Sequence, residues 1–122
     1  MSEAREILVV EDDSDIQESL KTFLELEGFR VSSAMNGREA LDYLAKGHSP
    51  CLILLDLMMP VMTGYQFLDA VNSPSPTKVP PIIIFSAASD VETTAKSRSV
   101  PYIKKPISLE MLLDVIQKYC GS

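Results

Sequence analysis

A single carboxylate interrupts an almost wholly apolar stretch of the chain. The segment 52–60 reads LILLDLMMP, and Asp56 is its only charged residue. Removing an unpaired charge from water costs several kcal/mol. Asp56 can emerge into a wet cleft where the apolar run ends, or it can meet a cation supplied by another part of the chain; the rest of the sequence favours both. In both cases the carboxylate stays available for chemistry.

Polar residues also follow three other apolar runs. ILVV (7–10) is followed by Glu11, Asp12 and Asp13, PIIIF (81–85) by Ser86, and YIK (102–104) by Lys105. If the ends of these runs meet, carboxylates, a hydroxyl and an ammonium converge on one cleft. Carboxylates placed so closely repel one another by roughly 1–4 kcal/mol per pair and attract a hard cation such as Mg²⁺. A carboxylate can also attack phosphorus to form an acyl phosphate, while a metal ion and a lysine neutralise the transferring group.

The runs that carry these residues alternate with segments of helical spacing. The apolar runs are ILVV (7–10), FRVSSA (29–34), CLILL (51–55), PIIIF (81–85) and YIK (102–104). Strands that alternate with helices imply right-handed βαβ units and a parallel sheet. We therefore predict an α/β fold, a doubly wound, flavodoxin-like (βα)5 sheet with strand order 2-1-3-4-5. Ligands of such sheets bind beyond the carboxyl ends of the strands, here between the first and third strands.

Capping signals predict where the helices begin and end. Four pairs have the spacing of a capping box: Ser14 with Gln17, Asn36 with Glu39, Thr63 with Gln66, and Ser89 with Glu92. Gly28 and Gly47 stand where the first two helices should stop. The fourth helical segment, 89–99, has only Val91 and Ala95 as an apolar stripe, so a short or frayed helix is expected there.

Composition limits the class of protein. The 122 residues and their 46% hydrophobic content suit one globular domain, 1–122. A net charge of −6 argues against a nucleic-acid partner. No apolar run approaches the ~20 residues of a membrane span, and MSEARE is no signal peptide. Cys51 and Cys120 match no metal spacing and no disulfide framework, so a reducing, cytoplasmic setting is expected.

At its polar blocks the sequence resembles the receiver domain of two-component response regulators, which act in phosphorelay signal transduction. The blocks LVVEDD (8–13), LLDLMMPVMTG (54–64), FSA (85–87) and YIKKP (102–106) match that family's signatures in order. The resemblance covers almost the whole chain. It implies a signalling module that assists its own phosphorylation, takes its phosphoryl group from a histidine kinase or phosphotransfer protein, and controls a downstream effector protein or domain.

The resemblance also implies a role for individual residues. Its implied assignments are Asp56 as phosphoacceptor; Asp12, Asp13 and Asp56 with the backbone carbonyl of Met58 as Mg²⁺ ligands; Lys105, rather than Lys104, as the phosphate-binding lysine; Ser86 and Tyr102 as the switch pair; and a cis bond between Lys105 and Pro106. Met58 and Ala88 would flank the path of the water that hydrolyses the phosphate. Neither can orient that water, so slow self-dephosphorylation is expected.

Two other functions compete with this interpretation. A haloacid-dehalogenase-like phosphatase also uses an aspartate nucleophile, and DSD (13–15) offers the required pattern. The chain has no room for a cap domain, however, and Ser14 is expected to be an N-cap. A pseudo-receiver that binds partners without phosphorylation is the third possibility, but such domains usually lack part of the acidic cluster or the lysine. Locating an acyl phosphate separates the receiver from the phosphatase, since the receiver would carry it on Asp56 and the phosphatase on Asp13.

Overall fold

Five parallel strands form the central sheet of the computed structural model, which describes residues 5–71, 80–87, 89–98, 100–105 and 108–120. The strands are β1 (Glu6–Val10), β2 (Arg30–Ala34), β3 (Leu52–Leu55), β4 (Ile82–Ser86) and β5 (Tyr102–Lys104). Their order in the sheet is β2-β1-β3-β4-β5, with every pair parallel. The predicted fold class and strand order are confirmed.

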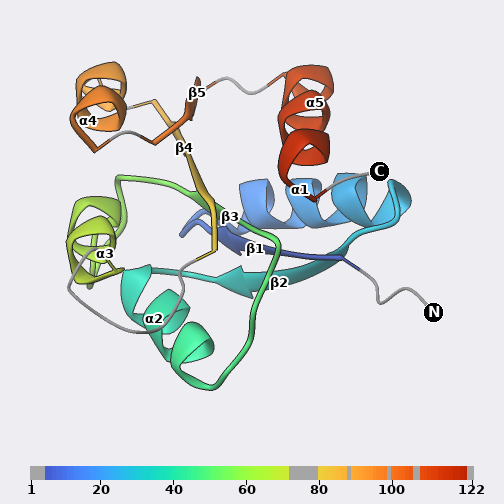
Figure 1. Ribbon diagram of the computed structural model, residues 1–122, viewed down its shortest axis with the longest axis horizontal. Helices are drawn as coiled ribbons and strands as arrows, with labels where there is room; N and C mark the ends of the chain where they lie inside the picture. Colours follow the sequence, from blue (N-terminus) through green and yellow to red (C-terminus); the bar gives the residue numbers. More distant parts are fainter. Residues whose placement is uncertain (1–4, 72–79, 88, 99, 106–107, 121–122) are drawn as a thin grey trace.

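Helices cover both faces of this sheet (Figure 1). On one face lie α1 (Ser14–Leu26) and α5 (Leu109–Cys120); on the other lie α2 (Gly37–Ala45), α3 (Gly64–Val71) and α4 (Val91–Arg98). Each face has its own core, and successive residues of β1 alternate between them: Leu8 packs on the α2–α4 side and Ile7 on the α1–α5 side. Because both faces are buried, the interior strands need unbroken apolar runs rather than alternation.

Most of the predicted helix ends agree with the structure. Asn36 caps α2, where its side chain accepts a hydrogen bond from the backbone N–H of Glu39. Thr63 and Gln66 bond reciprocally, as a capping box does. Gly28 and Gly47 both have φ of +95°, the left-handed conformation in which glycine ends a helix without strain.

The starts of α1 and α4 differ from the predictions. Asp13, not Ser14, is the N-cap of α1. The α4 helix begins at Val91, with the carbonyl of Asp90 accepting its first hydrogen bond, so the proposed Ser89 box is wrong by one position. In both cases an aspartate next to the expected serine precedes the helix. The Asp13 side chain accepts backbone hydrogen bonds at the start of α1, whereas the Asp90 carboxylate accepts from the Tyr65 and Thr94 hydroxyls.

The fourth helix is short, as its weak pattern predicted. It contains eight residues, about two turns, and Val91 and Ala95 are its buried apolar residues. A hydrogen bond from the Tyr65 hydroxyl to the Asp90 carboxylate, at 2.7 Å, joins α3 to the residue before α4. The length of α4 and its two buried apolar residues agree with the short helix that the weak apolar pattern of segment 89–99 predicted.

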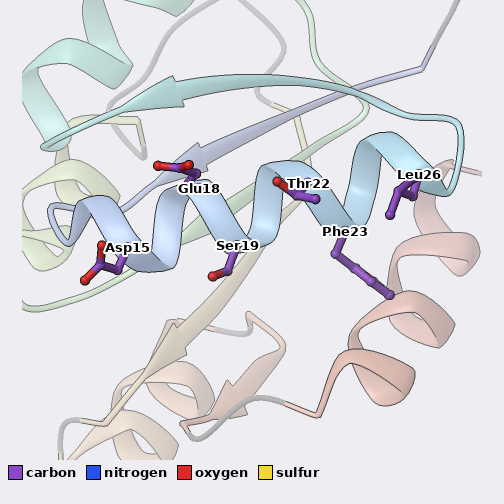
Figure 2. Close-up of a pocket in the computed structure, with 6 residues that line it drawn as sticks. All are labelled: Asp15, Glu18, Ser19, Thr22, Phe23 and Leu26. Atoms are coloured by element: carbon purple, nitrogen blue, oxygen red, sulfur yellow. The ribbon is translucent and has the colours of Figure 1, made fainter.

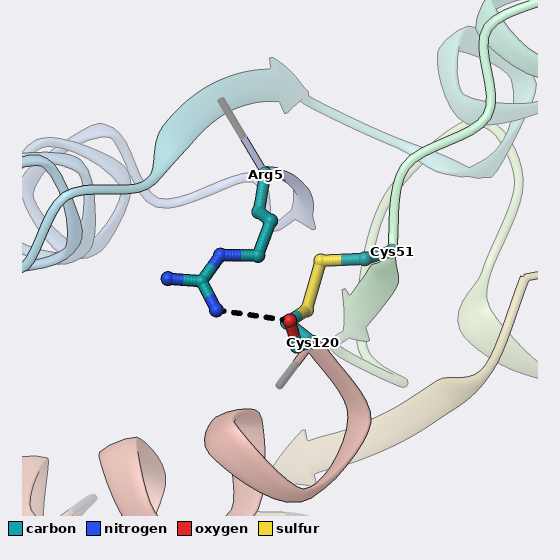
Figure 3. The surroundings of a disulfide bond; sticks show 3 residues. All are labelled: Arg5, Cys51 and Cys120. Carbon is teal, nitrogen blue, oxygen red and sulfur yellow. Dashed lines mark hydrogen bonds between the residues drawn. A yellow bond between two sulfur atoms is a disulfide. The ribbon is translucent and has the colours of Figure 1, made fainter. Parts of the chain in front are cut away.

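The two cysteines form a disulfide, which corrects the expectation of none (Figure 3). Cys51 directly precedes β3 and Cys120 is the last residue of α5; their Cα atoms lie 5.4 Å apart although 69 positions separate them in sequence. Arg5 donates a hydrogen bond to the backbone oxygen of Cys120 at 3.0 Å. Local spacing could not reveal this pair, because only the packing of α5 against the sheet brings the two residues together.

Among the described residues, no helix is long and apolar enough to cross a membrane.

Candidate functional site

Three carboxylates meet where the strand order reverses. Glu11 and Asp12 follow β1, Asp56 follows β3, and one oxygen from each lies within 4.8 Å of the others. The backbone N–H of Asp56 donates to the carbonyl of Val10 at 3.0 Å, which extends the β1–β3 pairing to the acidic residues. Glu11 and Asp56 are only 1% and 4% exposed, whereas Asp12 is exposed. Two buried carboxylates side by side need a cation.

Lys105 supplies that cation. Its Nζ lies 2.7 Å from Glu11 Oε1 and 3.6 Å from Asp56 Oδ2. The backbone N–H of Lys105 donates to the carbonyl of Ser86 at 3.1 Å, which anchors the residue beside the end of β4. The sequence favoured both explanations for Asp56; the structure brings the cation to it, as Lys105, and leaves the residue only 4% exposed.

One ammonium does not fully compensate two buried carboxylates. The pKa of Glu11 is raised from 4.5 to about 7; burial is the largest cause, the hydrogen bonds from Lys105 and from the backbone of Asp13 oppose it, and the neighbouring charge of Asp56 adds to it. Desolvation is the largest of these effects because it disfavours the ionised carboxyl. The cluster therefore has spare negative charge that a second cation could neutralise.

Asp13 does not join the cluster that was predicted to contain it. Its Oδ1 accepts hydrogen bonds from the backbone N–H groups of Asp15 and Ile16, at 2.9 and 3.2 Å. Its own N–H donates to Glu11 Oε2 at 3.1 Å. The acidic cluster therefore consists of Glu11, Asp12 and Asp56, while Asp13 serves as the N-cap of α1. The resemblance had implied Asp12 and Asp13 as the acidic pair; because Asp13 caps α1, the residue that lies beside Asp12 and Asp56 is Glu11.

The loop between β3 and α3 shapes the surroundings of Asp56. The backbone N–H of Met58 lies 3.4 Å from Asp56 Oδ1, and the Met58 side chain is 62% exposed. A Cβ on Gly64 would lie 2.3 Å from the backbone oxygen of Asp56, so α3 can begin this close to the loop after β3 only with a glycine. Close approach of the backbone is therefore the physical requirement for glycine at position 64.

The remaining predicted residues lie on β4 and β5. Ser86 is fully buried at the end of β4, and Lys104 is exposed. Tyr102, the first residue of β5, is half-buried and packs against the core on the α2–α4 side. Ala88 and Pro106, and with Pro106 the expected cis bond, lie outside the described residues.

A shallow hollow runs along the outer side of α1 (Figure 2). All of its lining residues come from that helix: Asp15, Glu18, Ser19, Thr22, Phe23 and Leu26. In Figure 2 the Phe23 side chain extends toward α5, while the two carboxylates lie toward the amino-terminal half of the helix. None of the predicted site residues lines this hollow, so it adds nothing to the chemistry of the acidic cluster.

Comparison with known proteins identifies the family. A family model described as the response regulator receiver domain matches residues 7–117. Protein PilG of Pseudomonas aeruginosa is 33% identical over 124 aligned residues, which cover 99% of this chain and 91% of PilG. Several other relatives are longer, and the chain spans 26% to 50% of their length.

Solved structures give the same result. The chemotaxis protein CheY4 of Vibrio cholerae superposes with a TM-score of 0.81 at 31% identity, covering 96% of this chain and 99% of CheY4. The response regulator TrrA of Thermotoga maritima, solved in complex with Mg²⁺-BeF, has a TM-score of 0.81 at 29% identity, covering 94% of this chain and 98% of TrrA.

Proposed function

The chain belongs to the response regulator receiver domain family, and from that premise we propose that Asp56 is the residue that accepts the phosphoryl group. One observation carries the assignment: Asp56 is the carboxylate that follows the central strand β3, and Lys105 and two further carboxylates surround it. Receiver domains of this family are phosphoacceptor modules of two-component signalling. The proposal assigns the roles within the module to particular residues.

Glu11, Asp12 and Asp56 are the proposed Mg²⁺ ligands. The donor set fits a hard cation, because carboxylate oxygens and water are the ligands that Mg²⁺ prefers. The spare negative charge of the cluster and the exposure of Asp12 support the same site. When bound, the ion would neutralise charge on the transferring phosphoryl oxygens. The backbone carbonyl of Met58 remains a predicted fourth protein ligand.

The chain's own residues then account for phosphoryl transfer. An Asp56 carboxylate oxygen forms the new bond to phosphorus, while the bond from phosphorus to the leaving group breaks and the leaving group keeps the electron pair. Lys105 turns its ammonium toward the oxygens of the transferred group. The buried Ser86 hydroxyl is the proposed donor to the phosphorylated state, and Tyr102 the aromatic residue that follows its movement. The donor is a histidine kinase or phosphotransfer protein, and the output goes to an effector protein or domain.

Labelling with acetyl phosphate tests the acceptor. This small donor supplies an activated phosphoryl group without a kinase, so intact-mass measurement should show one added phosphate that requires Mg²⁺. Asp56→Asn should abolish it, and Lys105→Ala should impair the conformational response more than the labelling itself. Phosphate found on Asp13 instead would refute the assignment.

Thermal unfolding with and without Mg²⁺ tests the metal ligands. A ligand that binds only the folded state stabilises it by about 2.7 kcal/mol at a hundredfold excess over Kd. Asp12→Asn should reduce that gain. Asp13→Asn is the matched control, because asparagine caps a helix as well as aspartate does and the neighbouring carboxylates remain. If both variants lose the same amount of Mg²⁺-dependent stabilisation, Asp13 rather than Glu11 is the third carboxylate ligand beside Asp12 and Asp56.

The phosphatase alternative is not favoured. It would require Asp13 as nucleophile, but the Oδ1 of Asp13 already accepts two backbone hydrogen bonds at the start of α1. Ser14 was expected to be the cap and is not. Because the cap is Asp13, the proposed nucleophile itself is engaged at the helix start, which is a stronger argument against the phosphatase. A pseudo-receiver is not favoured either, since the acidic cluster and Lys105 are both present.

A further inference from the structure

We propose that Gln17 is a positioning residue for the metal site: its buried side-chain amide fixes the backbone of Glu11, and through it the Glu11–Asp12 pair. The inference rests on the proposed function, because it assigns those two carboxylates to Mg²⁺. Gln17 lies on α1, touches none of the three carboxylate side chains in the described hydrogen bonds, and acts only through main-chain groups.

The amide of Gln17 joins three separate parts of the backbone. Its Nε2 lies 2.8 Å from the carbonyl of Val9, 3.0 Å from that of Glu11 and 3.0 Å from that of Ala34. These carbonyls belong to β1, to the turn after it, and to the end of β2. The backbone N–H of Glu11 also donates to the carbonyl of Ala34, and Gln17 adds hydrogen bonds to buried carbonyls at the edge where the two strands end. The two N–H groups of this one side-chain amide, in a residue that is 6% exposed, are shared among the three carbonyls.

Glu11 is consequently held at each of its polar groups. Its N–H donates to the carbonyl of Ala34 at 2.9 Å, and its own carbonyl accepts from Gln17. Its two carboxylate oxygens accept from Lys105 and from the N–H of Asp13. Lys105 and Asp13 hold the carboxylate, but Gln17 fixes the peptide that continues into Asp12. A shift of that peptide would move both proposed ligands together.

The orientation of the amide is set by its partners. Gln17 Oε1 is buried without a hydrogen-bond partner among the described residues. Reversing the amide would place this oxygen against three carbonyl oxygens and remove the hydrogen bonds that Gln17 donates to them, so the present orientation is the favourable one despite the desolvated oxygen. The side chain is therefore used for its donors. The capping role that its spacing from Ser14 suggested does not occur.

Loss of these donors should weaken metal binding without abolishing the chemistry. Methionine matches glutamine in length and offers no donor, so in Gln17→Met the three carbonyls lose this partner and the turn carrying Glu11 and Asp12 is no longer fixed. Outer-shell hydrogen-bond partners typically change metal affinity 10–100-fold. We expect the Kd for Mg²⁺ to rise about tenfold, while the rate of labelling by acetyl phosphate at saturating Mg²⁺ stays within about threefold of the parent, since the ion then restores the geometry.

Mg²⁺ titrations followed by backbone amide chemical shifts test this on the full chain. Leu24→Ala is the matched control: Leu24 is buried on the same helix, so its truncation costs stability without touching the turn, and its Kd should equal the parent's. Should Gln17→Met fail to fold, Gln17→Glu keeps the shape, replaces the donors with acceptors, and should lose at least as much affinity.

The possible outcomes are distinguishable. A parent-like Kd in a folded Gln17 variant overturns the positioning role and leaves the proposed function intact. An equal rise in Leu24→Ala also overturns it, because general destabilisation would then explain the effect. A parent protein that does not bind Mg²⁺ overturns the metal assignment of the proposed function, and the inference with it.

Discussion

Breaking the Cys51–Cys120 disulfide should remove a large part of the domain's stability. The bond closes a loop of 69 positions between the start of β3 and the end of α5. In the chain-entropy description, a cross-link that closes a loop of this length lowers the conformational entropy of the unfolded chain. The unfolding free energy rises by about 4 kcal/mol at 25 °C as a result. Domains of this size unfold with only about 5–15 kcal/mol in total, so the loss should be obvious in any equilibrium measurement.

The assay is urea unfolding of the oxidised protein, of the protein in reductant, and of the double variant Cys51→Ser, Cys120→Ser. The reduced protein and the double variant should each lose about 4 kcal/mol, which for a domain of this length lowers Tm by roughly 12–16 °C. Reductant should not affect the double variant, which controls for other effects of the reagent.

Two results would refute this reasoning. If reductant leaves the parent's unfolding curve unchanged, or if two free thiols titrate in unfolded protein kept oxidised, the cross-link does not contribute as described. Labelling of Asp56 should survive in the double variant wherever it is folded, because Cys51 precedes β3 and Asp56 follows it, at opposite ends of the strand.

Three further predictions follow from single residues. Without divalent cations, the unfolding free energy should fall as pH rises from 4.5 to about 7, since Glu11 ionises at lower pH in the unfolded chain than in the folded one. Urea midpoints measured across this range should decrease with pH, and Glu11→Gln should make that decrease smaller. Met58→Asn should speed loss of phosphate from the purified domain, up to ~10²-fold, by orienting the attacking water; an unchanged decay rate contradicts the argument. Tyr65→Phe removes the hydrogen bond to Asp90 and should cost about 1 kcal/mol, with faster amide exchange confined to α4 as the check.

The elements that the sequence predicted well are those fixed by local physical chemistry. Unbroken apolar runs identify strands buried on both faces, as in β3, and a glycine in the left-handed conformation ends a helix, as Gly28 does. Alternating strands and helices then leave few topologies, because parallel crossovers are right-handed. The same logic placed Asp56 and Lys105 at one edge of the sheet before any contact was known.

The errors came where one residue had two possible local partners. The spacing indicated Ser14 as the cap of α1, but Asp13 is the cap, and Glu11 lies in the acidic cluster to which the resemblance had assigned Asp13. Gln17 matched a capping box by spacing, but its side chain turns inward to main-chain carbonyls. Periodicity cannot separate these alternatives, because each is consistent with the same helix and differs only in which atoms face the sheet.

By itself, the sequence determined the fold, the strand order and the edge at which chemistry occurs, since these depend on patterns that repeat along the chain. The tertiary structure alone decided that Glu11 rather than Asp13 faces Asp56, that Lys105 lies 2.7 Å from Glu11, and that Cys51 meets Cys120. Each of these pairs is a contact between side chains that different elements carry. Such contacts depend on how helices pack on the sheet, to within a fraction of a helical turn, and no local pattern encodes that.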